Sequence, residues 1–313
     1  MTQSTVPPMM MTFFSEVVSW ECDELGHLNM RHYMTKTEQA RQMFFMRLGL
    51  EDAFKSGSDS TVRTREFTVR YLKESRPAER IRIETGILSI NEDSADLLHI
   101  FYHGGQTVSA VILETVHHIY LRTGEAFRWP QRVREAAPSV MCKLPSIAMT
   151  RGLPDVGIPA AHRRESLIEK GAKLIGMGVF LPTETDVFEC VTPQTLCGRA
   201  SDSIGNFTEA WGGRIEEFTA GNSTISGALL EIRGFIHRPA TAGNPFEFYS
   251  ALHGANPYTR QITHHIVNPI TGESWASMIA SSCLFDVKSR KLVKADAEEI
   301  AQIMAISIPN LGP

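Results

Sequence analysis

The stretch ECDELGHLNMRHY, residues 21–33, decides both the fold of this chain and its candidate site. It places Asp23, His27 and Asn29 at the point where a strand-like pattern changes to a helical one. Over residues 31–48, apolar and other core-type residues recur at steps of three and four, which predicts a helix. The glycine at position 49 is typical of a helix C-terminus.

Strand patterns surround this turn and helix. Residues 13–20 form a predicted strand before the turn. After the helix come the runs FTVRYL, RIRIETGILSI, LLHIFYH and VSAVILETVHHIYL, separated by turn signals. A strand, a helix and four further strands predict an α+β unit in which an antiparallel sheet wraps around one helix.

The second half is predicted to repeat this plan. A strand at 186–191 and a turn TLCGRAS at 195–201 precede a helical run that carries Ile204, Phe207, Trp211 and Ile215. The runs LLEIRGFI, FEFYSAL, ITHHIV and SWASMIASSCLF supply the strands. The repeat predicts an N-terminal domain over 1–130, a proline-containing connection over 131–175 and a C-terminal domain over 176–313.

Alignment of the two predicted turns pairs Asp23 with Thr195 and Gly26 with Gly198. Further along the two halves, His99 pairs with His264. Short apolar strands also resemble one another by chance, so the order of elements carries more weight than any single pair. The agreement in order favours an internal duplication.

The composition fits two intracellular globular domains. The chain has 313 residues, of which 42% are hydrophobic and 21% charged, and its net charge of −4 argues against a nucleic-acid-binding protein. Five scattered cysteines suggest neither a disulfide framework nor a zinc site. The N-terminal residues do not resemble a signal peptide, and no apolar run approaches the roughly 18 residues of a membrane span. We therefore expect a cytoplasmic protein without membrane partners.

The turn at 23–29 combines groups that thioester hydrolysis needs. A carboxylate can activate water or attack a carbonyl directly, and the free N–H groups of a helix start can hold a developing negative charge. A purely structural role is the alternative for each residue. Asp23 or Asn29 could simply cap the helix, and His27 could be a loop residue that hydrogen-bonds to backbone.

DELGHLN followed by Tyr33 resembles the signature of hotdog thioesterases related to 4-hydroxybenzoyl-CoA thioesterase and to plant acyl-ACP thioesterases. The stretch FTVRYLKESRPAERIRIETGI resembles the strand, turn and strand that follow the helix in that family. The resemblance covers residues 12–128 well and 186–294 weakly. It implies a double hotdog, with two tandem hotdog domains, and hydrolysis of an acyl thioester.

The resemblance also implies roles for the residues of the turn. Asp23 becomes the catalytic general base or nucleophile, and His27 and Asn29 orient the water or the thioester. Gly26 lets the backbone approach the substrate carbonyl, and Tyr33 is the aromatic residue of the central helix that contacts the substrate. The family often has a second asparagine where this chain has Met30, and Glu38 on the helix is a reserve candidate for the acid.

In the second half, the predicted alignment places Thr195, Arg199 and Ser201 where the first half has Asp23, His27 and Asn29. The second domain is therefore expected to help bind the substrate without hydrolysing it. For the phosphates of coenzyme A, Arg70 is the first candidate. Further candidates on or before the strands that follow the helix are Arg63, Arg65, Arg80 and Arg82. For each of the five arginines, Arg70 included, the alternative is a charged residue on an exposed strand face or sheet edge.

The sequence thus predicts an acyl-CoA thioesterase that needs no metal or redox cofactor, with coenzyme A as part of its substrate. An acyl carrier protein is the other carrier left open. The alternatives are a non-catalytic double hotdog that binds acyl thioesters and a hotdog enoyl-CoA hydratase or dehydratase. A homodimer of two such chains is a further expectation, because two-fold symmetric dimers are the commonest oligomers.

Overall fold

A computed structural model of the chain describes residues 9–153, 157–210, 221 and 224–313. The chain divides into two compact units, Met1–Met149 (unit 1) and Thr150–Pro313 (unit 2). The connection expected over 131–175 is divided between these units. In the described residues, every helix is too short or too polar to traverse a bilayer.

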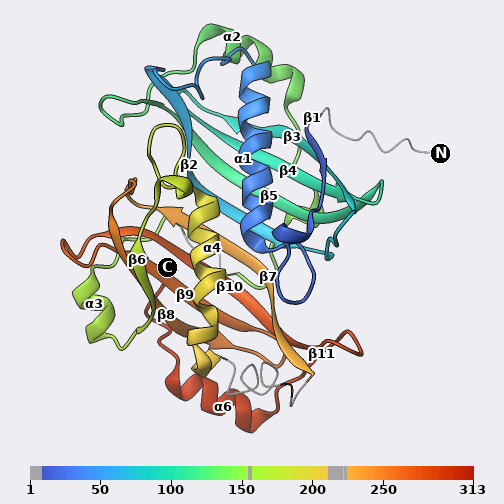
Figure 1. Cartoon of the computed structure of the whole chain (residues 1–313), viewed down its shortest axis with the longest axis vertical. Helices are drawn as coiled ribbons and strands as arrows, with labels where there is room; N and C mark the ends of the chain where they lie inside the picture. The colour runs from blue at the N-terminus through green and yellow to red at the C-terminus, as the bar shows by residue number, and fades with distance from the viewer. Residues whose placement is uncertain (1–8, 154–156, 211–220, 222–223) are drawn as a thin grey trace. The chain divides into compact units, whose positions relative to one another are not determined.

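Unit 1 packs a long helix against an antiparallel sheet. Its elements are β1 (Met10–Glu16), α1 (Met30–Arg47), β2 (Ser60–Tyr71), β3 (Arg80–Ile90), β4 (Ser94–His103), β5 (Thr107–Tyr120) and α2 (Gln131–Ala136). The strands lie in the order β1-β3-β4-β5-β2, and each neighbouring pair is antiparallel. Figure 1 shows α1, in blue, lying across one face of this sheet.

Helix α1 has the bounds that the sequence pattern predicted, to within one residue. Tyr33, Thr37, Ala40 and Phe44 recur at three- and four-residue steps and are all buried. Gly49 follows the helix with φ of +97°, a left-handed conformation that favours glycine at this end.

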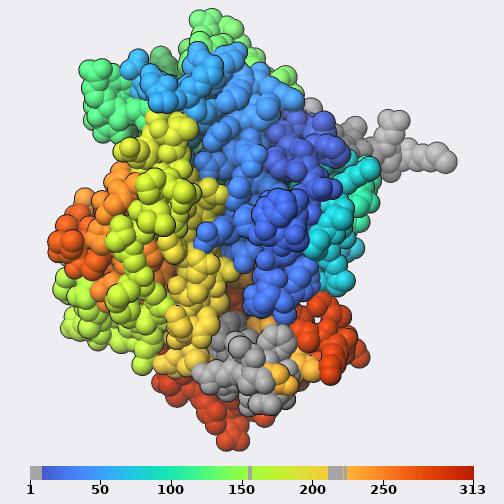
Figure 2. Space-filling view, viewed as in Figure 1, coloured from blue at the N-terminus to red at the C-terminus, as the bar shows by residue number. Residues whose placement is uncertain are grey.

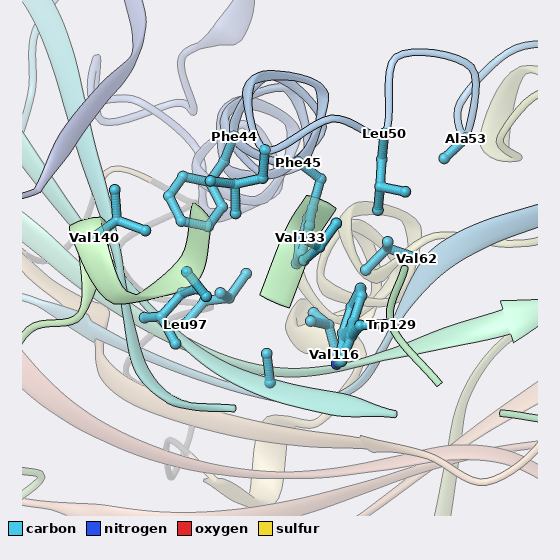
Figure 3. Packing of buried hydrophobic residues seen from close by; sticks show 14 residues of the cluster. Phe44, Phe45, Leu50, Ala53, Val62, Leu97, Val116, Trp129, Val133 and Val140 are labelled. Carbon is cyan, nitrogen blue, oxygen red and sulfur yellow. The ribbon is translucent and has the colours of Figure 1, made fainter. Parts of the chain in front are cut away.

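The distal half of α1 sits on the apolar core of unit 1, shown in Figure 3. Phe45 stacks on Trp129 with ring centroids 5.2 Å apart. Val133 and Val140 lie in the same cluster, so residues 131–140 complete this core rather than forming a free connection. Burial of a side chain of this size typically contributes about 1.5–3 kcal/mol.

Unit 2 repeats the same element order. Its elements are α3 (Arg164–Glu169), β6 (Lys173–Val179), α4 (Pro193–Ser203), β7 (Ile225–Ile236), β8 (Pro245–Ala255), β9 (Arg260–Val267), β10 (Ser274–Asp286), β11 (Lys291–Leu292) and α6 (Ala297–Ile306). The strands lie in the order β7-β10-β9-β8-β6, with β11 on β10. Written from its other end, β6-β8-β9-β10-β7, this order matches that of unit 1 strand for strand. Along the chain, α4 lies between the first and second strands of unit 2, as α1 does in unit 1.

Two predictions for the start of the second half were wrong. The strand expected at 186–191 is a turn, and the turn expected at 195–201 lies inside α4. The expected helix through Trp211 and Ile215 falls outside the described residues. Helix α4 carries small residues at Cys197, Gly198 and Ala200, so it lacks the bulky stripe that marked α1.

The register of the strands confirms one predicted pair. Thr85 pairs with His99 across β3 and β4, and Ser250 pairs with His264 across β8 and β9. In both units the hydroxyl is hydrogen-bonded to Nδ1 of the histidine, at 2.9 and 2.7 Å. His99 and His264 therefore occupy the same place in the two sheets.

Residues 151–152 are hydrogen-bonded to side chains of the unit 2 sheet. The Glu231 carboxylate accepts hydrogen bonds from the N–H groups of Arg151, at 3.0 Å, and Gly152, at 2.8 Å. The Gln261 amide donates to the Gly152 carbonyl at 2.6 Å. Gly152 lies so close to the strand that an added Cβ would meet Ser281 Oγ at 2.4 Å.

Candidate functional site

Asp23 organises a tight turn before α1. Its Oδ1 accepts hydrogen bonds from the N–H groups of Leu25, at 3.0 Å, and His27, at 3.1 Å. Its own N–H donates to the His27 carbonyl at 2.8 Å, and the Gly26 N–H donates to the Asp23 carbonyl at 3.0 Å. Gly26 has φ of +75°, so the glycine serves the left-handed step of the turn.

The start of α1 leaves one N–H group available. Asn29 is the N-cap, and its Oδ1 accepts from the Arg31 N–H at 2.9 Å. The N–H groups of Leu28 and Asn29 donate to the carbonyls of Ser75 and Glu21. Within the described residues, the N–H of Met30, the first helical residue, donates to no protein group.

His27 is paired with a glutamate that the sequence did not single out. Its Nε2 lies 3.0 Å from Oε2 of Glu74, which follows β2 in the loop to β3. The imidazole is almost fully buried, whereas the Glu74 side chain is about one-third exposed, at 34%. The only available signal was its place in KESRPAER, a stretch that resembled the family but carried no role for Glu74.

Tyr33 ties the helix to this same loop. Its hydroxyl donates to Ser75 Oγ at 3.3 Å, and its ring packs edge-on against Tyr71 at 5.2 Å. Burial raises the pKa of Tyr33 to about 12, so the phenol is neutral. The predicted substrate contact is thus a buried side chain that connects α1 with the loop after β2.

A buried ion pair connects α1 with the residues that precede the Asp23 turn. The Lys36 ammonium lies 2.7 Å from Glu21 Oε1, and the two side chains are 3% and 14% exposed. The same carboxylate accepts a hydrogen bond from the Val18 N–H at 3.3 Å. Such a pair fixes the direction of the chain where it enters the turn.

Unit 2 contains the same turn, built around Asp186. Its Oδ1 accepts from the N–H groups of Phe188, at 2.8 Å, and Cys190, at 3.0 Å. The Asp186 N–H donates to the Cys190 carbonyl at 2.8 Å. The supporting ion pair is Arg199 with Glu184, at 2.7 Å. Asp186, and not Thr195, therefore corresponds to Asp23.

The turn of unit 2 lacks the other groups of the unit 1 turn. Equivalent positions have Glu189 for Gly26, Cys190 for His27, Thr192 for Asn29, Pro193 for Met30 and Ala240 for Ser75. Proline has no N–H, so the donor at the first helical position is gone. The histidine and the asparagine are gone as well, and only the carboxylate remains.

The three residues predicted to replace the site in unit 2 lie in α4. Thr195 is buried, and its hydroxyl donates to the Glu184 carbonyl at 2.7 Å. Arg199 pairs with Glu184, and Ser201 lies half-buried further along the helix. Their assignment to the turn followed from the wrong alignment.

Two predicted residues of unit 1 are engaged within their own unit. Arg70 is buried, and its guanidinium donates to the Ile147 carbonyl at 2.6 Å. Glu38, the reserve acid, lies 3.9 Å from Arg41.

Arg41 belongs to a polar network in the middle of unit 1. Its guanidinium lies 2.7 Å from Glu114, whose other oxygen lies 3.1 Å from Nε2 of His99. Burial alone would raise the pKa of Glu114, but Arg41 and the histidine outweigh it and lower that pKa to about 2. The network is buried, and the hydrogen bond from Thr64 and the contact with His99 help to offset the cost of burying the Arg41–Glu114 charge pair.

The described residues contain no group of histidine, cysteine, aspartate and glutamate side chains that could hold a metal ion. The five cysteines are free thiols. Burial together with Asp23 and Glu21 raises the pKa of the Cys22 thiol, so it is not activated as a nucleophile.

Residues 17–137 match the model of the thioesterase-like superfamily. The match confirms the resemblance to thioesterases that the sequence showed in this part of the chain. The match contains the Asp23 turn, α1 and the whole sheet after β1, and it ends with α2. No curated protein matches the sequence.

Solved thioesterase structures share the fold of the chain. An acyl-ACP thioesterase from Bacteroides thetaiotaomicron is similar with a TM-score of 0.63 and 10% identity, covering 88% of this chain and 98% of its own. A 12:0-ACP thioesterase from Umbellularia californica gives 0.65 and 12% identity, covering 88% and 93%. The TM-scores show that the hotdog-like fold is shared. At identities this low, the likeness does not identify the substrate.

Proposed function

We propose that this chain is a tandem double hotdog that hydrolyses an acyl thioester at the Asp23 turn of unit 1. The observation that carries the proposal is the difference between two otherwise equal turns. Both units hold an aspartate on the same pair of N–H groups. Only unit 1 adds the His27–Glu74 pair and a donor at the first residue of the helix.

Asp23 acts as the general base or as the nucleophile. Both turn N–H groups bind Oδ1, which leaves Oδ2 to accept a proton from water or to attack the carbonyl. In the general-base route, water adds to the thioester carbon while Asp23 accepts its proton. Collapse of the tetrahedral intermediate breaks the C–S bond, and the proton goes to the departing thiolate.

The Met30 N–H is placed to stabilise the oxyanion. It lies at the positive end of an 18-residue helix, and no described protein group accepts from it. Glu74, 3.0 Å from Nε2, orients the His27 ring and favours a proton on that nitrogen, so the pair can steady the turn and take part in proton transfer. Asn29 caps the first turn of the helix by accepting a hydrogen bond from the Arg31 N–H.

The test compares Asp23→Asn with Asp186→Asn. Asparagine keeps an Oδ1 acceptor, so both variants preserve their turns. We expect Asp23→Asn to slow thioester hydrolysis at least tenfold, within the roughly 10²- to 10⁴-fold typical of acid–base groups. Asp186→Asn, the matched control, should leave turnover unchanged. Equal losses in both variants, or none in either, would reject the assignment.

The substrate panel should contain acyl-CoA and acyl carrier protein thioesters of short, long and aromatic acyl groups. Acyl-CoA is the substrate that the sequence resemblance favours. The two solved structures above are acyl-ACP thioesterases, so that carrier belongs beside it. Tight binding across the panel without release of thiol would favour a non-catalytic acyl-thioester-binding protein instead.

A further inference from the structure

The unit 2 turn serves as an internal reference for the unit 1 turn. Features present in both turns build the scaffold, and features confined to unit 1 are candidates for function. His27, Glu74 and the Met30 N–H belong to the second group and have roles above. Trp20 belongs to it too, since Thr183 stands at its position in unit 2.

Trp20 is an unusually exposed aromatic side chain. It is 80% exposed, on the short 3-10 turn Ser19–Glu21 that leads into the Asp23 turn. Large aromatic side chains normally bury most of their surface, and their exposure often marks a contact with another molecule. In Figure 2 the dark-blue N-terminal part of the chain lies at the surface of the face shown.

The turn does not need the indole for its own stability. In unit 1, the Glu21 N–H donates to the Val18 carbonyl at 3.0 Å, and the Val18 N–H donates to the Glu21 carboxylate at 3.3 Å. In unit 2, Glu184 and Leu181 make the same two bonds, both at 2.9 Å. Threonine at the middle position suffices there, so the tryptophan serves something outside the turn.

The backbone that carries Trp20 is also held in place. The neighbouring Glu21 is held by buried Lys36 at 2.7 Å. A side chain presented on a rigid turn loses little conformational freedom when it binds a ligand, which favours a binding role. Its backbone is three residues from Asp23, a separation of at most about 11 Å.

We propose that Trp20 binds the pantetheine arm of the substrate, a proposal that rests on the thioesterase function above. A thioester whose carbonyl lies at Asp23 continues through this arm before it reaches a nucleotide or a carrier protein. The backbone separation of at most about 11 Å is shorter than an extended pantetheine arm, so a thioester held at Asp23 has an arm long enough to contact Trp20. The indole face suits its geminal methyl groups, and the indole N–H suits its amide carbonyls. Coenzyme A and acyl carrier protein share this arm.

The experiment replaces Trp20 with the residue of unit 2, Trp20→Thr, and with phenylalanine as the conservative variant. One acyl group is supplied as its CoA, pantetheine and ethyl thioesters. For the first two, Trp20→Thr should raise KM about tenfold and leave kcat within about twofold. The ethyl thioester lacks the arm and should show no change. Trp20→Phe should recover most of the loss.

Each other outcome overturns the proposal. An equal rise in KM for the ethyl thioester indicates general damage, and a rise for the CoA thioester alone assigns Trp20 to the nucleotide. With an acyl carrier protein thioester the rise should equal that for acyl-CoA. If the wild type hydrolyses none of them, the thioesterase function fails by itself. Arm binding is then measured by pantetheine quenching of Trp20 fluorescence, with Trp20→Thr as the reference, and no Trp20-dependent quenching overturns it.

Discussion

Replacing Met30 with proline removes one hydrogen-bond donor and nothing else that the helix needs. Met30 is the first residue of α1, where the N–H has no partner within the helix. Proline is favoured at this position, and it requires the preceding residue to be extended. Asn29 already has φ of −64° and ψ of 146°. Unit 2 has Pro193 at the same place, after an extended Thr192.

The expected loss follows from the role of the N–H as an oxyanion donor. Removal of one such donor typically lowers kcat by about 10²- to 10³-fold, equivalent to about 2.7–4 kcal/mol of transition-state stabilisation. Met30→Ala is the matched control, because it removes the same side chain and keeps the N–H. We expect Met30→Pro to lose kcat by about that factor relative to Met30→Ala, with little change in KM.

The assay is thiol release under saturating acyl thioester, with the thermal midpoint measured alongside. Equal kcat for the proline and alanine variants, at equal thermal midpoints, would refute the reasoning. A lower midpoint for Met30→Pro alone would show that the proline distorts the helix start, contrary to its tolerance in unit 2.

Three further predictions concern stability, measured by thermal or denaturant unfolding. Gly152→Ala should destabilise the chain by about 1–3 kcal/mol because its Cβ meets Ser281 Oγ at 2.4 Å, and adding Ser281→Ala should restore most of the loss. Burial lowers the pKa of His264 to about 4, so the folded state should lose stability as pH falls from about 6.5 towards 4, by on the order of 3 kcal/mol. His264→Gln should flatten that dependence, and an unchanged slope would contradict the cause. Arg41→Met should cost about 3–5 kcal/mol because Glu114 then stays charged without its partner, whereas Arg41→Met with Glu114→Gln should recover part of it.

The sequence predicted the first half of the molecule well because its signals are local. The helix over 31–48 has bulky residues at regular steps, and the Asp23 motif sits where the strand pattern ends. Glu74 was missed because it is far from His27 in sequence, and only the path of the loop after β2 brings the two together. Pairing at that range depends on tertiary structure that periodicity does not encode.

The second half was misaligned because its local signals are weak. The residues of α4 are small, and Gly198 and Ser201 resemble turn signals, so the helix was placed after them. The carboxylate of Asp186 was consequently overlooked, although the element order was right. The hydrogen bonds of the turn, which are specific to backbone geometry, were needed to identify the equivalent aspartates.

Glu189 stands at the left-handed step of the unit 2 turn, with φ of 61°. A residue with a side chain pays about 1–2 kcal/mol for that conformation, whereas glycine adopts it freely. Unit 2, to which our proposal gives no catalytic step, tolerates this cost, and α4 still begins at the position equivalent to the start of α1. Both units thus share the scaffold of the turn, and our proposal assigns the chemistry to one of them.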